Sequence, residues 1–128
     1  ARLRRHLRPL LPDGVKFEID LEPTHFPSDI VSNIGLIVNE FVANSAKHGL
    51  SSKGEGVVSI EGRRDGGIYR LRCTDNGHAD ETSLSAVGNS TGLGTRIIAS
   101  SAQAIGGSAE WRLGHPGLVL AIRFPARG

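Results

Sequence analysis

The chain has 128 residues, a formal net charge of +2 and a single cysteine, which suits one domain with one hydrophobic core and excludes a scaffold built on internal disulfides. Cys73 lies in a segment that alternates apolar and polar residues, so we expect a small buried side chain in a reducing compartment. No apolar run reaches the roughly 18 residues of a membrane-spanning helix and no signal-peptide pattern opens the chain, so we expect a soluble, cytoplasmic domain without direct membrane contact.

The first 14 residues are more basic than the rest of the chain. Four arginines lie within the first eight residues, and without them acidic residues outnumber basic ones. A nucleic-acid-binding domain carries basic residues across its folded surface, so we expect no nucleic-acid partner. We expect residues 1–14 to be the end of a preceding linker or helix, with a basic arm as the alternative, and residues 15–128 to form the folded domain.

A strand and a long helix follow this basic segment. Residues 15–21 alternate apolar and charged side chains, which predicts a half-buried strand. Ser28 is suited to cap a helix, apolar residues then recur at helical spacing, and Gly49 is suited to end it.

The second half of the chain predicts two hairpins separated by a loop and a short helix. Strands at 57–62 and 68–74 flank a glycine-rich turn, and residues 76–91 show no periodicity. A helix is expected over 93–105, followed by the strands of a last hairpin over 108–113 and 118–124. Because hairpins dominate, we expect an α+β fold: a two-layer sandwich of a mixed, mostly antiparallel sheet with helices on one face.

Three polar residues form a narrow stripe on the predicted long helix. At about 100° per residue, Glu40, Asn44 and Lys47 fall within an arc of about 60° beside a broad apolar arc. An ordinary solvent-facing stripe is one interpretation, although asparagine is a poor helix former. The other is a site in which Asn44 binds Mg²⁺, Lys47 meets a phosphate and Glu40 acts as a base or orients water. His48 is either a further phosphate contact or a favourable charge at the helix end.

Asp75 ends a predicted strand in the sequence Thr-Asp-Asn-Gly. The period of two places its side chain on the same face as Cys73, toward the core, where a carboxylate needs a partner. The amino group of a purine is one candidate partner, with Gly77 letting the base approach the backbone. The alternative is a β-turn in which Asp75 bonds only its own backbone.

Residues 90–95 form a glycine-rich segment that runs into the second predicted helix. Free N–H groups and the positive end of a helix dipole can hold a phosphate, and Gly92 and Gly94 would let it approach the backbone. The segment also fits an ordinary helix start. It lacks the GxxxxGK[ST] pattern of a P-loop, and the five histidines show no metal-ligand spacing with Cys73.

In this order, the motifs resemble the GHKL ATPase superfamily, and most of all the catalytic ATP-binding domain of bacterial sensor histidine kinases of the HWE-related type. LIVNEFVANSAKHG is similar to the N box, TDNG to the start of the G1 box, and STGLGTRIIASSAQAIGG to the G2 box and its helix; the resemblance covers residues 15–125. It implies a Bergerat-type fold and an ATP-dependent histidine protein kinase. The γ-phosphoryl group would pass to a histidine on the dimerisation domain of the same kinase and then to the receiver domain of a response regulator; the fragment lacks the phosphoacceptor histidine.

The resemblance implies a role for each residue of the helix stripe. Asn44 would bind the Mg²⁺ that bridges the phosphates of ATP, and Glu40 would be the catalytic carboxylate. Lys47 and His48 would contact phosphate.

The resemblance also implies how the rest of the nucleotide is held. Asp75 would accept a hydrogen bond from the adenine amino group, and Gly77 would form the floor of that pocket. The residues expected to wrap the triphosphate are Gly92, Leu93 and Gly94.

Two positions depart from the family pattern. Ala79 stands where the G1 box has its second glycine, and Leu118 follows Gly117 where the family has a threonine. The pocket therefore lacks one hydroxyl group unless Thr74 supplies it. These departures keep open a degenerate domain that serves as a docking surface, and an anti-sigma-factor serine kinase of the same fold is a second alternative.

Overall fold

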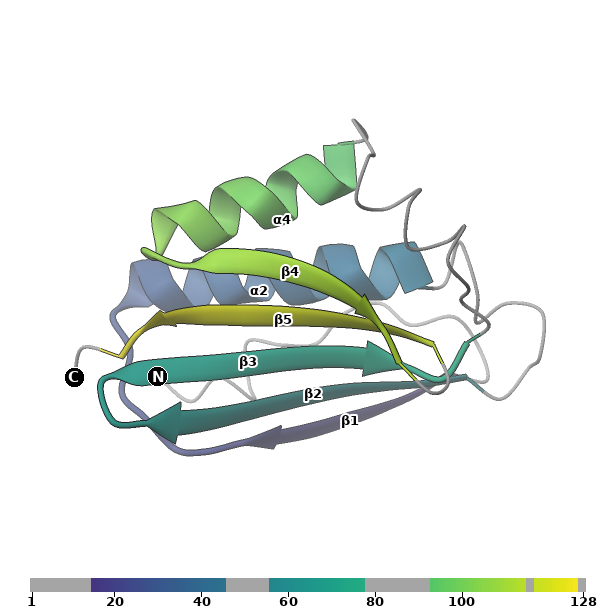
Figure 1. Cartoon of the computed structure of the whole chain (residues 1–128), viewed down its shortest axis with the longest axis horizontal. Helices are drawn as coiled ribbons and strands as arrows, with labels where there is room; N and C mark the ends of the chain where they lie inside the picture. The colour runs from purple at the N-terminus through teal and green to yellow at the C-terminus, as the bar shows by residue number, and fades with distance from the viewer. Residues whose placement is uncertain (1–14, 46–55, 78–92, 115–116, 127–128) are drawn as a thin grey trace.

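The computed structural model describes residues 15–45, 56–77, 93–114 and 117–126, which form a five-stranded sheet covered on one face by two helices (Figure 1). The strand order is β1-β2-β3-β5-β4. β1 and β2 pair in parallel, and the other neighbouring strands pair antiparallel. The elements in chain order are β1 (Val15–Leu21), α2 (Ser28–Ser45), β2 (Gly56–Asp65), β3 (Ile68–Asp75), α4 (Leu93–Ala104), β4 (Ser108–Leu113) and β5 (Leu118–Pro125). The predicted α+β class and two-layer arrangement are confirmed.

The predicted elements are all present, with differences at their ends. β2 extends to Asp65, three residues beyond the predicted strand, so the turn contains only Gly66 and Gly67. The shorter turn is possible because Gly66 adopts a φ of 62°, a backbone conformation that residues other than glycine rarely adopt. The described part of α2 ends at Ser45, and the predicted end of the helix at Gly49 lies outside the described residues.

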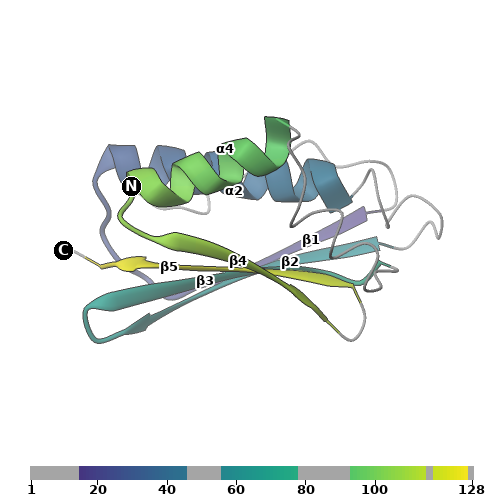
Figure 2. The same cartoon turned by 45° about the horizontal axis from the view of Figure 1, so that its top comes forward.

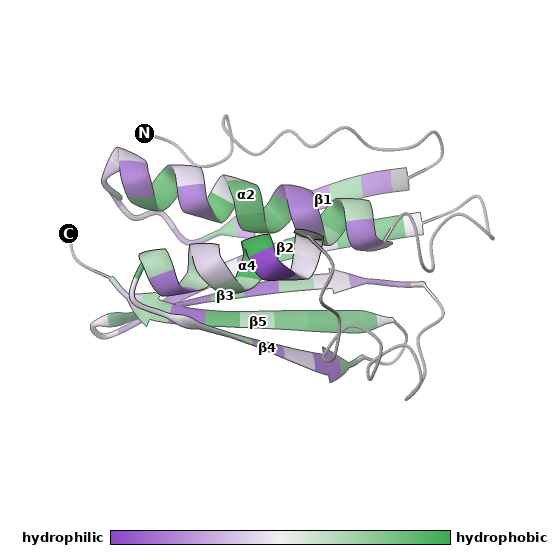
Figure 3. Cartoon of the chain, turned by 90° about the horizontal axis from the view of Figure 1, so that it is seen from above, coloured by the Kyte–Doolittle hydropathy of each residue, from purple (hydrophilic) through white to green (hydrophobic). Residues whose placement is uncertain are grey.

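The core lies between the sheet and the two helices. Figure 2 shows both helices on the same side of the twisted sheet. Figure 3 shows apolar residues along most of β5, which lies between β3 and β4. α2 turns one apolar face to the sheet at a spacing of three and four residues, and α4 adds a smaller one. The buried side chains from the helices include Ile34, Ile37, Val38, Phe41, Val42, Ile98 and Ala102. Because α2 is fixed along its whole length, the polar residues on its flank are held in defined positions.

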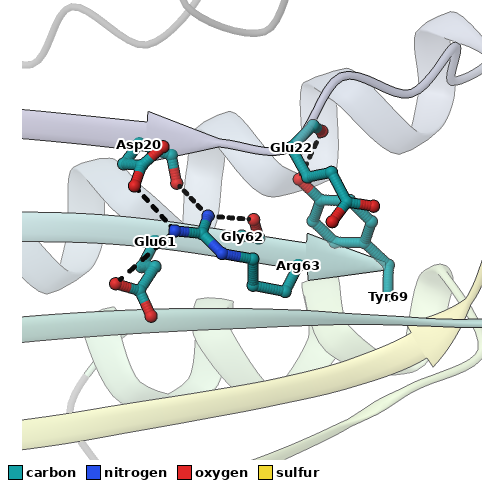
Figure 4. A network of polar contacts seen from close by, with 6 residues as sticks. All are labelled: Asp20, Glu22, Glu61, Gly62, Arg63 and Tyr69. Carbon is teal, nitrogen blue, oxygen red and sulfur yellow. Dashed lines mark hydrogen bonds and ion pairs between the residues drawn. The ribbon is translucent and has the colours of Figure 1, made fainter. Parts of the chain in front are cut away.

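A polar network fixes one end of the sheet, where β1 ends and β3 begins (Figure 4). The buried Tyr69 donates a hydrogen bond from its hydroxyl to the carbonyl of Glu22, at 3.0 Å. The guanidinium of Arg63 donates to the Oδ2 of Asp20 at 2.6 Å and to the carbonyl of Gly62 at 2.7 Å. Tyr69 and Asp75 lie at opposite ends of β3, so this network is remote from Asp75.

Candidate functional site

The polar stripe of α2 lies at the edge of its buried face. Glu40 and Asn44 are half-buried, whereas Phe41, directly after Glu40, is fully buried. Phe41 stacks on Trp111 of β4, with ring centroids 6.0 Å apart and planes 20° from parallel. This aromatic contact ties the C-terminal half of α2 to the sheet, so the side chains of Glu40 and Asn44 start from a rigid backbone.

Asp75 points from the end of β3 toward the helices, as the strand period predicts. Asp75 is only 8% exposed. Its Oδ2 accepts a hydrogen bond of 2.7 Å from the hydroxyl of Ser45 on α2. Ser45 directly follows Asn44 in the chain. This hydrogen bond therefore brings the end of the α2 stripe against the end of β3.

The second oxygen of Asp75 is held by backbone N–H groups. Oδ1 accepts from the N–H of Gly77 at 3.0 Å and from the N–H of Leu118, the first residue of β5, at 3.2 Å. The contact with Gly77 is the local turn bond that the β-turn alternative describes. That alternative is nevertheless incomplete, because Ser45 and Leu118 are distant in sequence and also bond the carboxylate.

The hydroxyl group that bonds Asp75 comes from Ser45, and the strand geometry does not favour the alternative that Thr74 supplies it. Successive residues of a strand point to opposite faces of the sheet. Thr74 pairs with Ser59 and Val119, whereas Asp75 pairs with the buried Val58 on the face that the helices cover.

The start of α4 meets Glu40. A Cβ placed on Gly94 would lie 2.9 Å from Oε2 of Glu40, closer than real Cβ atoms approach an oxygen. The glycine therefore admits the carboxylate to the first turn of α4, where N–H groups and the helix dipole favour a negative charge.

Three of the predicted motifs thus meet at one end of the molecule. In Figure 1 the last turn of α2, the tip of β3, the start of β5 and the first turn of α4 all lie at the right-hand side. Gly77 is buried there, beside Asp75. Leu93 is the first residue of α4, and Lys47, His48 and Gly92 lie outside the described residues.

Two contributors to this site were missed in the sequence: the hydroxyl of Ser45 and the N–H of Leu118. Ser45 follows Phe41 by four residues and Val38 by seven, so helical spacing alone placed it on the buried face, where a hydroxyl needs a partner. No sequence pattern signals the N–H of Leu118, because its role depends on how β5 packs beside β3.

The donor chemistry suits a metal that is shared with a ligand. Asn44 and Glu40 offer amide and carboxylate oxygens, the atoms that Mg²⁺ prefers. Within residues 15–45, 56–77, 93–114 and 117–126, no group of three His, Cys, Asp or Glu side chains could hold a metal. Phosphate oxygens would have to complete such a site, which is the usual way that Mg²⁺ binds with a nucleotide.

Comparisons with known proteins identify the fold. No protein-family model matches the chain. It is 25% identical over 115 residues to blue-light-activated histidine kinase 2 of Erythrobacter litoralis (strain HTCC2594). The aligned region covers 88% of this chain and 32% of that protein. The ATP-binding domain of PrrB from Mycobacterium tuberculosis superimposes with a TM-score of 0.64 and 23% identity, over 91% of this chain and 83% of that one. The chain has the fold of a histidine kinase ATP-binding domain.

The histidine kinase domain of the blue-light-activated kinase from Erythrobacter litoralis EL346 has the same fold. It superimposes with a TM-score of 0.76 and 24% identity, over 90% of this chain and 53% of that one. The predicted resemblance to the ATP-binding domain of histidine kinases is thus confirmed. The chain spans about a third of the curated kinase that it matches and about half of this solved domain. Among the described helices, none is both long and apolar enough to cross a membrane.

Proposed function

We propose that this chain is the ATP-binding catalytic domain of a sensor histidine kinase, an ATP-dependent phosphotransferase. The observation that carries the proposal is the meeting of three separate segments: Ser45, next to Asn44, bonds Asp75, and Glu40 lies against Gly94. An amide, two carboxylates and a helix N-terminus at one end of a sheet suit a nucleotide with its metal. The similarity to histidine kinases in fold and sequence supports the same function.

The proposed roles divide the nucleotide between two parts of the site. Asp75 accepts a hydrogen bond from the amino group of the base, and Gly77 forms the floor of the pocket that holds the base. Asn44 holds Mg²⁺ through its amide oxygen, and the metal neutralises charge on the phosphates when it is bound. Glu40 is half-buried and acts as the catalytic carboxylate that orients the attacking group.

The remaining contacts to the triphosphate are proposed from the sequence motifs. Gly94 and the other N–H groups at the start of α4 wrap the phosphates, together with Leu93 and Gly92. Lys47 and His48 add positive charge near the phosphates. Positioning and charge neutralisation, without a covalent intermediate on this domain, are sufficient for phosphoryl transfer.

The proposed partners lie outside this domain. The γ-phosphoryl group goes to a histidine on the dimerisation domain of the same kinase, and from there to the receiver domain of a response regulator. We place this reaction in the cytoplasm, where ATP is the phosphoryl donor, and take residue 15 as the start of the catalytic domain.

Asp75 keeps a hydrogen-bond donor at position 118, although Leu118 stands where the family has a threonine. The backbone N–H of Leu118 donates to Oδ1, so the carboxylate is fixed although the family's threonine hydroxyl is absent. This weakens the case for a degenerate docking domain. An anti-sigma-factor serine kinase differs in the residue that it phosphorylates, so acid-labile phosphohistidine on the partner domain, rather than stable phosphoserine, supports the histidine kinase.

The test compares two asparagines on the same helix. Asn44→Ala removes the proposed metal ligand, whereas Asn39→Ala makes the same change at an exposed position about 140° away around α2. Calorimetric titration with MgATP is expected to show binding by the unchanged chain and by Asn39→Ala, and loss of at least about a hundredfold in affinity for Asn44→Ala. Equal affinity of the two variants would contradict the assignment of Asn44, and no binding by the unchanged chain would contradict the proposed function.

A further inference from the structure

The carboxylate of Asp75 has few free acceptor positions. Each carboxylate oxygen offers about two lone-pair directions. Oδ1 already accepts from the N–H groups of Gly77 and Leu118, and Oδ2 accepts from the hydroxyl of Ser45. Counting the donors among the residues that the structure describes, one acceptor position remains, on Oδ2, beside the Ser45 hydroxyl.

The surroundings of Asp75 prevent the carboxylate from turning to expose its other oxygen. Ser45 is only 4% exposed and is held by α2, and both N–H donors belong to the backbone. Gly117, with a φ of 86°, packs so closely that a Cβ there would overlap Oδ1 and the carbonyl oxygen of Asp75. The orientation of the carboxylate is thus fixed from α2, from the turn after β3 and from the start of β5.

We propose that Ser45 is a positioning residue for base recognition: it holds Asp75 so that a single acceptor position faces the ligand. This inference rests on the proposed function. One acceptor suits the 6-amino group of adenine, which needs to donate a single hydrogen here. Guanine instead presents two adjacent donors, its N1–H and its 2-amino group, which bind best to a carboxylate with both oxygens free. The arrangement therefore favours adenine over guanine.

Ser45 acts through Asp75, so its effect depends on whether the ligand has an amino group. In the Ser45→Ala variant, Oδ2 loses its only described hydrogen-bond donor. The carboxylate is then held on the Oδ1 side alone, and a water molecule can take the place of the hydroxyl at Oδ2. A ligand that donates to Oδ2 would lose affinity. A ligand without that donor would not.

The experiment titrates two nucleotides into the same set of chains. ATP carries the 6-amino group, and purine riboside triphosphate is the same molecule without it. Ser101→Ala is the matched control, since Ser101 is also a buried helical serine, also 4% exposed, but lies on α4. Melting temperatures of all variants are measured alongside, so that a general loss of folding is recognised.

Ser45→Ala is expected to weaken ATP binding on the order of tenfold. This is the effect of losing the hydrogen bond that the 6-amino group of ATP donates to the charged carboxylate of Asp75. Binding of purine riboside triphosphate is expected to be unchanged, and Ser101→Ala is expected to bind both nucleotides as the unchanged chain does. Equal losses for both nucleotides, or no loss for either, would overturn the inference.

One further variant and the result for the unchanged chain keep the experiment interpretable. If Ser45→Ala does not fold, Ser45→Cys preserves the size of the side chain and a weak S–H donor, and the same selective loss for ATP is expected in smaller degree. Failure of the unchanged chain to bind ATP would reject the proposed function itself. Binding by the unchanged chain with no selective loss in the variants would reject only the role of Ser45.

Discussion

The carboxylate of Glu40 lies against the backbone of Gly94, at the first turn of α4. The two residues belong to different motifs, 54 positions apart in sequence. A methyl group on Gly94 would sit 2.9 Å from Oε2 of Glu40, so any side chain there displaces the carboxylate. The contact links the proposed catalytic carboxylate to the helix that is proposed to hold the triphosphate.

Gly94→Ala is expected to separate stability from ligand binding. Alanine is a better helix former than glycine by up to about 1 kcal/mol, and the flexible end of Glu40 can move aside. The free energy of unfolding is therefore expected to stay the same or rise. Affinity for MgATP is expected to fall about tenfold, because the methyl group narrows the approach to the N–H groups and shifts Glu40. Denaturant unfolding and calorimetric titration measure the two effects.

Gly67→Ala is the control for Gly94→Ala. Gly67 lies in the exposed turn between β2 and β3, and a Cβ there meets nothing within 4 Å. Both properties are expected to stay near those of the unchanged chain. A loss of MgATP affinity in this control equal to that of Gly94→Ala would refute the explanation based on Glu40.

Tyr69→Phe tests the polar network at the opposite end of the sheet. The substitution removes the hydroxyl that donates to the carbonyl of Glu22 at 3.0 Å and leaves the ring in place. A loss of about 1 kcal/mol in the free energy of unfolding is expected, the usual effect of one such hydrogen bond. MgATP affinity is expected to be unchanged, because Tyr69 and Asp75 lie at opposite ends of β3. A reduced affinity in a fully folded variant would show that the two ends are coupled.

The elements of this fold were predictable because their patterns are local. The alternation in residues 15–21 and the apolar spacing of α2 follow from strand and helix geometry alone. The length of the first hairpin turn was not predictable in this way. Asp65 and Ile68 pair across the turn although Arg63, Arg64 and Asp65 are all polar, because that end of β2 is exposed and its side chains face water or the network of Asp20 and Glu22.

The site was predictable only in part, for a similar reason. The stripe of Glu40 and Asn44 and the inward direction of Asp75 follow from periods of a single element. The partners of Asp75 do not, since Ser45 is 30 residues and Leu118 43 residues away in sequence. Such contacts depend on how helices and strands pack together, and a single sequence does not encode them as a repeating pattern.

Cys73 is expected to make the protein less stable at alkaline pH. Burial raises the pKa of its thiol from 9.0 to about 12, because the thiolate is disfavoured in the core. Between these values the unfolded chain releases the proton and the folded chain keeps it, so unfolding becomes more favourable as pH rises above 9. The added slope is at most about 1.4 kcal/mol per pH unit. Burial also raises the pKa of Tyr69 to about 12, from 10.0, so the thiol is best isolated between pH 8.5 and 10.

The measurement is denaturant unfolding of the unchanged chain and of Cys73→Ala across that pH range. The variant is expected to be less stable at every pH, since it leaves a cavity beside buried neighbours. Its stability is nevertheless expected to fall less steeply with pH, because it lacks the titrating thiol. Parallel pH profiles for the two proteins would contradict a thiol that stays protonated in the folded state.

Gly117→Ala tests whether the backbone beside Asp75 is as crowded as the geometry indicates. Gly117 has a φ of 86° and Gly66 a φ of 62°, so both substitutions force a side chain into the left-handed region, at a cost of about 1–2 kcal/mol. They differ in surroundings, since a Cβ on Gly66 meets nothing within 4 Å whereas one on Gly117 overlaps oxygen atoms of Asp75. Gly117→Ala is therefore expected to lose at least about 3 kcal/mol in the free energy of unfolding, and Gly66→Ala only the conformational part. The displaced group is the proposed base-recognition carboxylate, so the folded fraction of Gly117→Ala is also expected to bind ATP more weakly, whereas Gly66→Ala is expected to retain full affinity. Equal stability and equal ATP affinity of the two variants would mean that β5 can move away from Asp75 without loss of stability or binding.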